Sequence, residues 1–324
     1  MAQKDVDEAP EVTSKVFFSP SSVAVIGASR REGAVGHEVV KNLLGCKYPG
    51  KIFPVNPKAD EILGLKCYPS VLNVEENVDL GVVAVPAEIV SEVAEEAGEK
   101  GVKGLIVISA GFKEVGSEGF ERERRLLDLC RRYNMRLVGP NCLGLINTFT
   151  PINASFAAQM PLKGGIAFAS QSGALCTAVL DWAARERIGF SNLISLGNMA
   201  DMDETDFMKL LAEDPNTKVI LIYIEGIKEG KKFLEVAPTV SRKKPVVILK
   251  SGVSDAGARA AASHTGSIAG SRIAYDAAFR RCGVLRVNSV EELFNLGIAF
   301  SYQPIPQGRG VAIVTNAGGP SIVA

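Results

Sequence analysis

Histidine is scarce in this sequence, and its cysteines form no regular motif. Only two of the 324 residues are histidines, His37 and His264. The six cysteines are scattered without a CxxC pair, which argues against a zinc site or a disulfide framework and indicates reduced thiols in a cytoplasmic protein. We therefore expect no metal-ligating set of residues.

Long apolar runs and an excess of charge of one sign are also absent. No apolar stretch approaches the roughly 18 residues of a membrane span, and residues 1–12 are polar and acidic, unlike a signal peptide. Thirty-six basic residues balance thirty-six acidic ones, so no general field attracts nucleic acid or a membrane surface. Hydrophobic residues make up 47% of the chain, which is enough for sizeable cores.

What the sequence does contain is an alternation of short apolar strands and helical segments. In the first half, strands are expected at 23–26, 52–55, 80–85, 104–108 and 136–138, with helices near 36–44, 89–97 and 118–133. This alternation predicts an α/β fold with a parallel sheet and right-handed crossovers. We expect a flexible tail at 1–15 and a Rossmann-like domain at 16–148.

A second series of strands and helices follows residues 148–162, which have no clear period and are interpreted as a crossover. Its strands are expected at 164–169, 193–195, 219–224, 246–249 and 284–285. We interpret residues 149–301 as a flavodoxin-like domain with a parallel sheet.

Residues 302–324 are interpreted as a linker and the first strand of a truncated third α/β domain, a second flavodoxin-like one. Val311–Val314 has the pattern of a buried strand that runs into a glycine turn. Because a lone strand cannot bury both faces, the alternative is an edge strand that pairs with the second domain. We favour the truncated domain.

His264 is the residue on which we expect chemistry. It lies in a loop of small residues between a predicted buried strand, which ends at Lys250, and a helix expected from Ser271. Such loops at the carboxyl ends of parallel strands are where open α/β sheets bind ligands. Small neighbours leave room for a group added to the ring, so we expect a covalent phosphoryl carrier. Glu225, after the strand 219–224, is positioned to hold one ring nitrogen while the other attacks.

A candidate anion site follows the first strand of the second domain. Ser170, Gln171, Ser172 and Gly173 join that strand to a helix, whose amino-terminal N–H groups and dipole favour negative charge. Capping of the helix by Ser172 is compatible with phosphate binding.

The first turn of the chain, Gly27-Ala28-Ser29, is a loose relative of the dinucleotide-binding fingerprint. A nicotinamide-binding domain normally has an acidic residue after its second strand, whereas this chain has Lys58, which attracts an extra phosphate such as that on the ribose of coenzyme A. An ordinary surface lysine and an NADP site remain alternatives. His37, near the start of the first helix, is interpreted as a capping or packing residue.

Further loops at strand ends of the first domain are candidates for the ligand crevice. They contribute Pro86, Ser109, Ala110, Gly111 and Asn141. Plain connecting turns are the alternative for the first two loops. Cys142 follows Asn141, and we interpret it as a buried spectator without a catalytic role.

Four segments, 21–29, 139–142, 170–174 and 263–266, together resemble one family. Over residues 18–324 the chain is similar to the α subunit, or α-like half, of ADP-forming acyl-CoA (acetyl-CoA) synthetases of the succinyl-CoA synthetase superfamily. The resemblance implies a CoA-binding Rossmann-like domain followed by a flavodoxin-like ligase domain. It also implies reversible conversion of acyl-CoA, ADP and phosphate to a carboxylic acid, CoA and ATP.

The resemblance also implies roles for individual residues. His264 matches the phosphorylated histidine and Glu225 its carboxylate partner, while 170–173 matches the phosphate site at a helix start. Gly27, Ser29 and Lys58 match positions that hold CoA. ADP or ATP with Mg²⁺ is implied to bind an ATP-grasp β subunit or missing C-terminal domains, without which full turnover is not expected.

Two other functions remain as alternatives. One is a CoA-binding regulatory or scaffold part of a lysine acetyltransferase fusion, although this chain has no acetyltransferase motif. The other is an NAD(P)-binding oxidoreductase, which would account for the first domain only and conflicts with Lys58.

Overall fold

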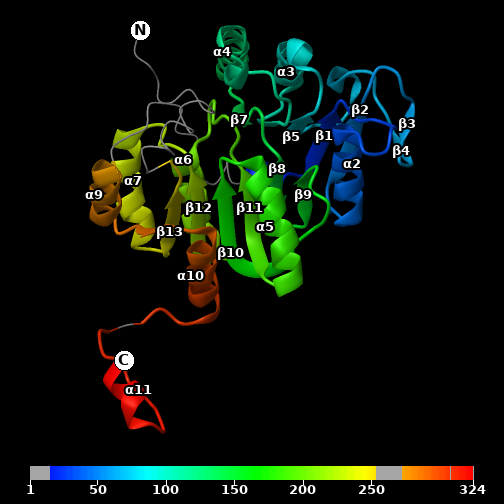
Figure 1. Cartoon of the computed structure of the whole chain (residues 1–324). Coiled ribbons are helices and arrows are strands. Elements are labelled where there is room, and N and C mark those ends of the chain that lie inside the picture. Colours follow the sequence, from blue (N-terminus) through cyan, green and yellow to red (C-terminus); the bar gives the residue numbers. More distant parts are fainter. Residues whose placement is uncertain (1–14, 253–271, 307, 324) are drawn as a thin grey trace.

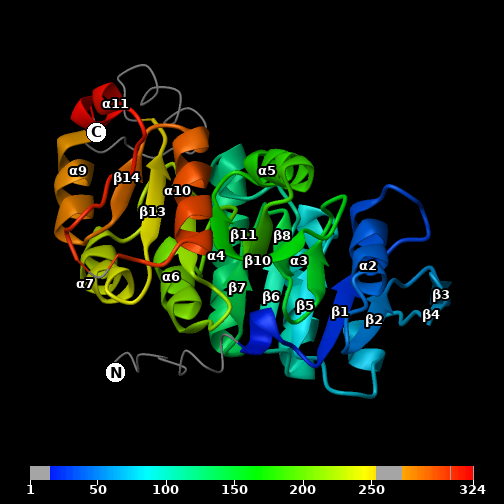
Figure 2. The ribbon, with the colours of Figure 1, turned by 90° about the horizontal axis from the view of Figure 1, so that it is seen from below.

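The computed structural model describes residues 15–252, 272–306 and 308–323 of the chain. Two α/β units lie next to one another, and a short C-terminal segment extends away from the second unit (Figure 1). Seen from below, α9 (Arg272–Arg281) of the second unit and α2 (Val35–Gly45) of the first lie toward opposite ends of the molecule (Figure 2). Among the described residues, no helix combines the length and apolar character needed to cross a membrane.

The first unit is a parallel sheet covered by helices on both faces. The strands are β1 (Ser22–Ile26), β2 (Lys51–Val55), β5 (Leu80–Val83), β6 (Gly104–Val107) and β7 (Arg136–Val138), in the order β2-β1-β5-β6-β7. Helices α3 (Ala87–Lys100) and α4 (Ser117–Arg132) pack together on one face. Helix α2 (Val35–Gly45) lies on the other face, toward the second unit. A small hairpin, β3 (Glu61–Ile62) and β4 (Leu65–Lys66), follows β2.

The second unit has a larger, mixed sheet in the order β14-β13-β12-β10-β11-β8-β9. Its strands are β8 (Gly144–Asn147), β9 (Ile152–Ser155), β10 (Leu162–Ser170), β11 (Gly189–Ser195), β12 (Val219–Ile224), β13 (Val246–Lys250) and β14 (Leu285–Val287). Helices α5 (Gly173–Glu186) and α10 (Val290–Tyr302) cover one face. Helices α6 (Glu204–Glu213), α7 (Gly230–Ser241) and α9 (Arg272–Arg281) cover the other face.

The predicted α/β class and the two-sheet arrangement are confirmed, but the second sheet is not purely parallel. Residues 148–162 were expected to be a simple crossover, and this expectation was wrong: β8 and β9 form an antiparallel hairpin that pairs with β11. The predicted strands at 80–85 and 104–108 are shorter in the structure and stop at Val83 and Val107, where the pairing of β5 with β1 and of β6 with β5 ends. Residues 84–85 and 108 instead begin the turns that follow the two strands.

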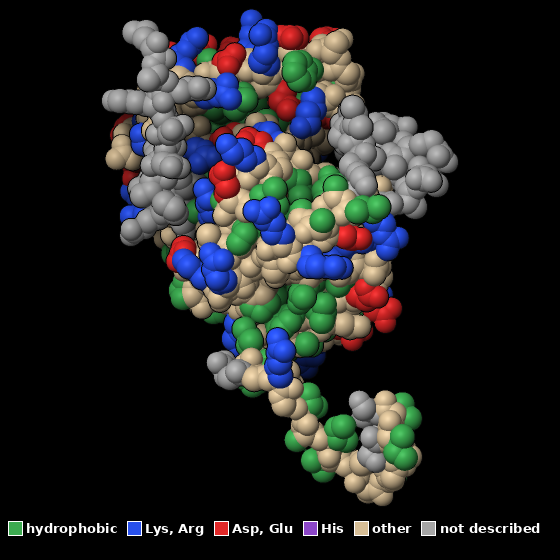
Figure 3. All heavy atoms as spheres, turned by 90° about the vertical axis from the view of Figure 1, so that its left-hand side faces the viewer, with side chains coloured by type: hydrophobic (Ala, Val, Ile, Leu, Met, Phe, Trp, Pro, Cys, Tyr) green, Lys and Arg blue, Asp and Glu red, His purple; other side chains and the backbone are tan. Residues whose placement is uncertain are grey.

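The prediction of a buried strand at Val311–Val314 was also wrong. These residues form no strand, and the exposed fractions of Val311 and Val314 are 85% and 97%. A short helix, α11 (Gly318–Val323), follows them. Figure 3 shows this segment as a separate protrusion that carries hydrophobic side chains. A strand needs a pairing partner, and neither the second sheet nor any other described strand provides one here.

Backbone pairing joins the two units where the loop after β11 meets the end of β7. Backbone N–H groups of Asn198, Ala200 and Met202 donate to carbonyl groups of residues 140, 139 and 137. Asp201 reinforces the junction, since its carboxylate accepts from the Arg136 guanidinium at 2.8 Å and from Leu137 N–H at 2.9 Å. The β9 edge packs on α2, and one apolar cluster continues from the first sheet into the second. The relative position of the two units is therefore fixed by hydrogen bonds and by a shared core.

Candidate functional site

Both sheets reverse their strand order at a point that faces the junction between the units. In the first sheet the reversal lies between β1 and β5, and in the second between β10 and β12. Open α/β sheets bind ligands at such reversals, outside the carboxyl ends of the strands. The turns that follow these four strands are therefore the places to look for a site.

A cavity of about 660 Å³ lies outside the carboxyl ends of β5, β6 and β10 and is lined by residues from both units. From the first unit come Val35, the residues directly after β5 and β6, and the loop after β7; from the second come Phe156, directly after β9, and the start of α5. Among the predicted site residues it brings together Ser109, Ala110, Asn141, Gln171, Ser172 and Gly173. We call it the junction cavity.

The start of α5 gives the junction cavity its anion-binding character. Ser172 caps the helix, because its hydroxyl accepts from Leu175 N–H at 3.2 Å. Gly173 and the exposed Ala174 begin the helix and line the cavity, and as first residues of the helix they have no intrahelical acceptor for their N–H groups. Ser170 is fully buried and lines neither this cavity nor the one described next; its hydroxyl accepts from Ser172 N–H at 3.0 Å.

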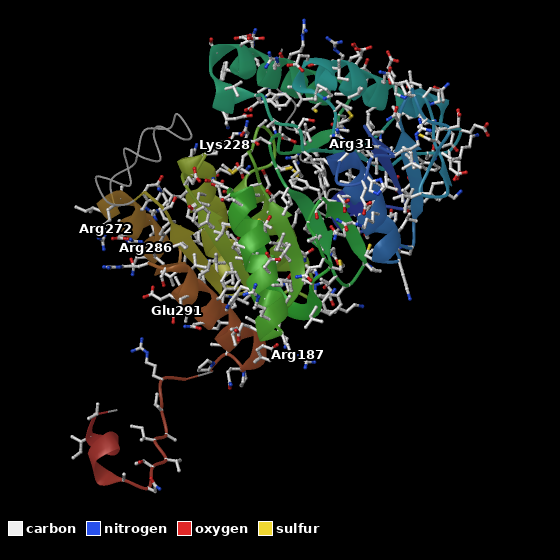
Figure 4. All side chains as sticks on the ribbon, turned by 45° about the vertical axis from the view of Figure 1, so that its right-hand side comes forward. Arg31, Arg187, Lys228, Arg272, Arg286 and Glu291 are labelled. Carbon is white, nitrogen blue, oxygen red and sulfur yellow. The ribbon has the colours of Figure 1, made fainter. Side chains whose placement is uncertain are left out.

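A second cavity, of about 300 Å³, lies on the other side of Asn141 and Gln171 and contains Glu225. Most of its polar lining is used within the protein. Asn198 Nδ2 donates to Glu114 at 2.6 Å and to Glu123 at 2.8 Å, and Lys228 donates to the carbonyl groups of residues 199 and 200 at 2.6 and 2.7 Å. Figure 4 shows Lys228 on the second unit and Arg31 on the first, on either side of the region where the units meet.

Glu225 follows β12. The charge of Lys250, which was not among the predicted site residues, acts on it. Lys250, the last residue of β13, is only 4% exposed; burial lowers the pKa of its ammonium group, while attraction to Glu225 opposes this shift. Lys250 Nζ also lies 4.8 Å from the centre of the Tyr275 ring. A lysine that ends an otherwise apolar strand was the sequence signal that could have identified it.

The β1–α2 turn of the first unit is built on glycine. Gly27 has φ +92°, and a Cβ atom there would lie 2.5 Å from the Ala84 carbonyl oxygen. A Cβ atom on Gly36 would lie 2.0 Å from the Gly27 carbonyl oxygen. Only glycine at these two positions therefore allows the start of α2 to approach the turn this closely. His37 is buried and its Nδ1 lies 2.9 Å from Ser29 O, which agrees with the packing role predicted for it.

Lys58 is exposed at the rim of this turn, and two arginines that the predicted site omitted accompany it. Arg30 donates to the Lys58 carbonyl group at 3.0 Å, and Asn56 Nδ2 donates to Ala28 O at 2.7 Å. Arg30 and Arg31 are exposed. Their positions directly after Ser29 were the available signal. The turn and its rim thus present three cations to solvent.

The remaining predicted residues are distributed as follows. Six of them line neither of the two cavities: Gly27, Ala28, Ser29, Lys58, Pro86 and Gly111. His264 lies outside the described residues. Cys142 is buried beside the junction cavity, and burial raises the pKa of its thiol to about 12, which keeps it protonated and agrees with a spectator role. No cluster of three or more potential metal ligands occurs in the part of the chain that the structure describes.

Comparison with known families matches both units. A family model described as a CoA binding domain matches residues 21–148, and one described as a succinyl-CoA ligase like flavodoxin domain matches residues 163–300. The chain is 53% identical over 309 residues to the ADP-forming acetate–CoA ligase I of Archaeoglobus fulgidus, covering 95% of this chain and 44% of that protein.

Separate α subunits and a solved structure agree with these matches. The α subunit of ADP-forming acetate–CoA ligase I from Pyrococcus furiosus is 47% identical, with 96% of this chain and 68% of the relative covered. A structure of an acetyl-coenzyme A synthetase from Ca. Korarchaeum cryptofilum, in complex with phosphate and ADP, matches with a TM-score of 0.90 at 45% identity, covering 94% of this chain and 66% of that one. The chain thus spans about two thirds of these two relatives and less than half of the A. fulgidus protein. This chain belongs to the family of ADP-forming acetate–CoA ligase (acetyl-CoA synthetase) α subunits.

Proposed function

We propose that this chain is the CoA-binding and phosphoryl-transfer part of an ADP-forming acyl-CoA ligase. The observation that carries the proposal is the junction cavity, where backbone of the first unit meets the start of α5 from the second. The proposed division into a CoA-binding domain at 16–148 and a ligase domain at 149–301 is supported by the ranges of the two family models. The family membership does not favour a scaffold or an oxidoreductase.

CoA is proposed to bind along the first unit and to extend into the junction cavity. The β1–α2 turn supplies close-approach backbone for the pyrophosphate, and Lys58 with Arg30 and Arg31 supplies positive charge for the ribose phosphate. The reactive end of CoA then lies beside the turns at Pro86, Ser109–Gly111 and Asn141. Val35, Val85 and Phe156 give the cavity an apolar lining suited to a thioester.

Phosphate is proposed to bind at the start of α5, where its oxygen attacks the thioester carbonyl carbon. The carbon–sulfur bond breaks, the CoA thiolate leaves, and an acyl phosphate forms. A neutral nitrogen of His264 then attacks phosphorus, the carboxylate leaves, and the histidine carries the phosphoryl group. The N–H groups of Gly173 and Ala174 stabilise negative charge on phosphate throughout.

Glu225 is proposed to orient the imidazole of His264 and to stabilise the ring while it is phosphorylated. The phosphohistidine then transfers its phosphoryl group to ADP. The site for ADP and Mg²⁺ is proposed to lie on an ATP-grasp β subunit or on further domains. This assignment is supported by the match to a synthetase in complex with phosphate and ADP, of which this chain covers 66%. A small carboxylic acid, such as acetate, is the proposed second substrate.

Phosphate labelling of His264 tests this proposal. The chain, assembled with its ATP-grasp partner and given γ-labelled ATP, should acquire an acid-labile, alkali-stable label. His264→Ala should abolish the label, and Glu225→Gln should reduce its rate of formation about 10- to 100-fold, as loss of an orienting partner typically does. Persistent labelling of His264→Ala would refute the assignment. Calorimetry should show binding of CoA, and tight binding of NADPH without any response to CoA would instead support an oxidoreductase.

A further inference from the structure

We propose that Gln171 is a positioning residue for Glu225 and not a phosphate ligand. Its side-chain amide fixes the backbone of Glu225 and Gly226, and so sets where the Glu225 carboxylate can lie. This inference rests on the proposed function of Glu225. It assigns to Gln171 a role different from the one that the neighbouring α5 start suggests.

The hydrogen bonds of Gln171 carry the inference. Its Oε1 accepts from the backbone N–H groups of Glu225 and Gly226, the latter at 3.3 Å. Its Nε2 donates to the Gly226 carbonyl group at 2.9 Å and contacts Met199 Sδ at 3.3 Å. A glutamine amide has two acceptor and two donor positions, and each has a protein partner here. No side-chain N–H group of Gln171 remains for a phosphate oxygen.

The place of these bonds in the sheet explains what they do. The β10–β12 ladder ends at the pair Ser170 and Tyr223, and Gln171 N–H donates to Tyr223 O at 3.1 Å. Beyond this point the chain after β12 has no strand on the β10 side to pair with. The Gln171 side chain replaces that strand and receives the next two backbone N–H groups. It thus extends the ladder by the residues that carry Glu225.

The position of the Glu225 carboxylate depends on a nearby positive charge as well as on the backbone bonds to Gln171. The buried Lys250 ammonium attracts the Glu225 carboxylate from the neighbouring strand β13. On the other side, Ser251 N–H donates to Ile224 O at 2.9 Å. The residue is therefore held between β10 and β13, with Gln171 fixing its main chain and Lys250 attracting its side chain. Loss of the amide would release the backbone while leaving the attraction in place, so the carboxylate would be displaced.

Gln171 also lies in the wall shared by the two cavities. The residues that follow it, Ser172 and Gly173, provide the start of α5 on the junction-cavity side. One side chain thus connects the backbone that is proposed to hold phosphate with the backbone that carries Glu225. Such a connection keeps the anion and the carboxylate at a constant separation.

A double-mutant cycle in the complete enzyme, assembled with its ATP-grasp partner, tests the inference. Gln171→Met keeps the length of the side chain and removes the amide. We expect it to slow labelling of the chain by ATP about 10- to 100-fold, as loss of an orienting partner does. In the presence of Glu225→Gln, Gln171→Met should add less than about twofold, because it acts only through that carboxylate. The KM for phosphate should change less than about twofold, since binding of phosphate is retained.

Gln159→Met is the matched control, because Gln159 is exposed and lines neither cavity. Gln171→Glu is a second variant, which keeps an acceptor for the two N–H groups and loses the donor to Gly226 O; it should be intermediate in rate. The melting temperature of Gln171→Met and its binding of CoA show whether that variant folds. If it does not fold, Gln171→Glu tests the inference in its place.

Several outcomes would overturn the inference. A raised KM for phosphate with unchanged kcat in Gln171→Met would make Gln171 a direct phosphate ligand. Effects of Gln171→Met and Glu225→Gln that multiply would show that the two residues act independently. An unlabelled wild-type enzyme would instead refute the proposed function itself, and labelling that is normal in Gln171→Met but slowed in Glu225→Gln would refute the positioning role alone.

Discussion

The two sheets share one order of parallel strands, yet their helices begin in different ways. When only the parallel strands of each unit are numbered along the chain, both sheets have the spatial order 2-1-3-4-5. In the first unit, α2, α3 and α4 begin after Ala34, Pro86 and Gly116, none of which forms a side-chain cap. In the second, Ser172, Asp203 and Ser289 cap α5, α6 and α10 with side-chain hydrogen bonds, and only α7, of the helix starts described there, begins after a residue without a cap, Glu229.

This difference fits a division of labour between binding and chemistry. Uncapped helix starts leave backbone N–H groups available to a ligand, and glycine turns let the ligand come close. Capped starts fix the helix before any ligand arrives, which suits a site where reacting groups must keep their positions. The cations in and beside the β1–α2 turn, Arg30, Arg31 and Lys58, are exposed, whereas Lys250 and Glu204 of the second unit are buried.

The sharpest test compares one glycine from each unit. Gly27→Ala should destabilise the chain by about 4 kcal/mol, because its Cβ would meet the Ala84 carbonyl oxygen at 2.5 Å and its φ is +92°. Gly173→Ala should cost nothing or stabilise slightly, since the nearest atoms to its Cβ lie 3.8 Å away and it occupies a helix. Urea unfolding of both variants measures the difference, and equal stabilities would remove the distinction between the two turns.

A buried carboxyl in the second unit gives the next largest effect. Glu204 is fully buried at the start of α6, and neither carboxylate oxygen has a hydrogen-bond partner among the described residues. Burial, together with the negative charge of Asp203, raises the pKa of Glu204 from 4.5 to about 7. The folded chain therefore holds the proton more tightly than the unfolded chain, and stability falls as the pH rises from about 4.5 to about 7.

Glu204→Gln should remove this loss. The variant should match the wild type near pH 4.5 and exceed its stability by about 3 kcal/mol above pH 7, the equivalent of the difference between the two pKa values. Urea unfolding at pH 4.5, 6 and 8 measures it. Glu235→Gln, at an exposed position on α7, is the control. A stability difference that stays constant across this pH range would show that Glu204 is ionised in the folded chain.

The sequence predicted most of the strands that build both ligand-facing edges. Short apolar runs that end in a turn were sufficient to place β1, β5, β6, β10 and β12. The β8–β9 hairpin was missed because its buried residues include Asn147, Asn153 and Ser155, which satisfy their polar groups among themselves and with β11. Their burial depends on pairing with distant strands, which a local pattern does not reveal.

The same dependence on distant strand pairing explains which parts of the site the sequence predicted and which it missed. The start of α5 follows from a local strand, turn and helix pattern, and the prediction of Ser172 as its cap is confirmed. The contact of Gln171 with Glu225 depends instead on β10 and β12 being neighbours, although 54 residues separate them in the chain. At Val311–Val314 the local pattern predicted a strand for which the described fold has no partner.

The smallest expected effect comes from exchanging the helix caps of the two units. Ser172→Ala removes the bond to Leu175 N–H and should cost about 1 kcal/mol of stability. Ala34→Ser should gain up to about 1 kcal/mol, because Ala34 already has the extended backbone of a capping residue. The new hydroxyl would occupy an N–H group at the start of α2, so the affinity for CoA should fall although the chain becomes more stable. Calorimetry with CoA, combined with urea unfolding, measures both quantities. Since an N–H group cannot serve a cap and a phosphate oxygen fully at once, unchanged CoA affinity in a stabilised Ala34→Ser chain would mean that α2 does not hold the pyrophosphate.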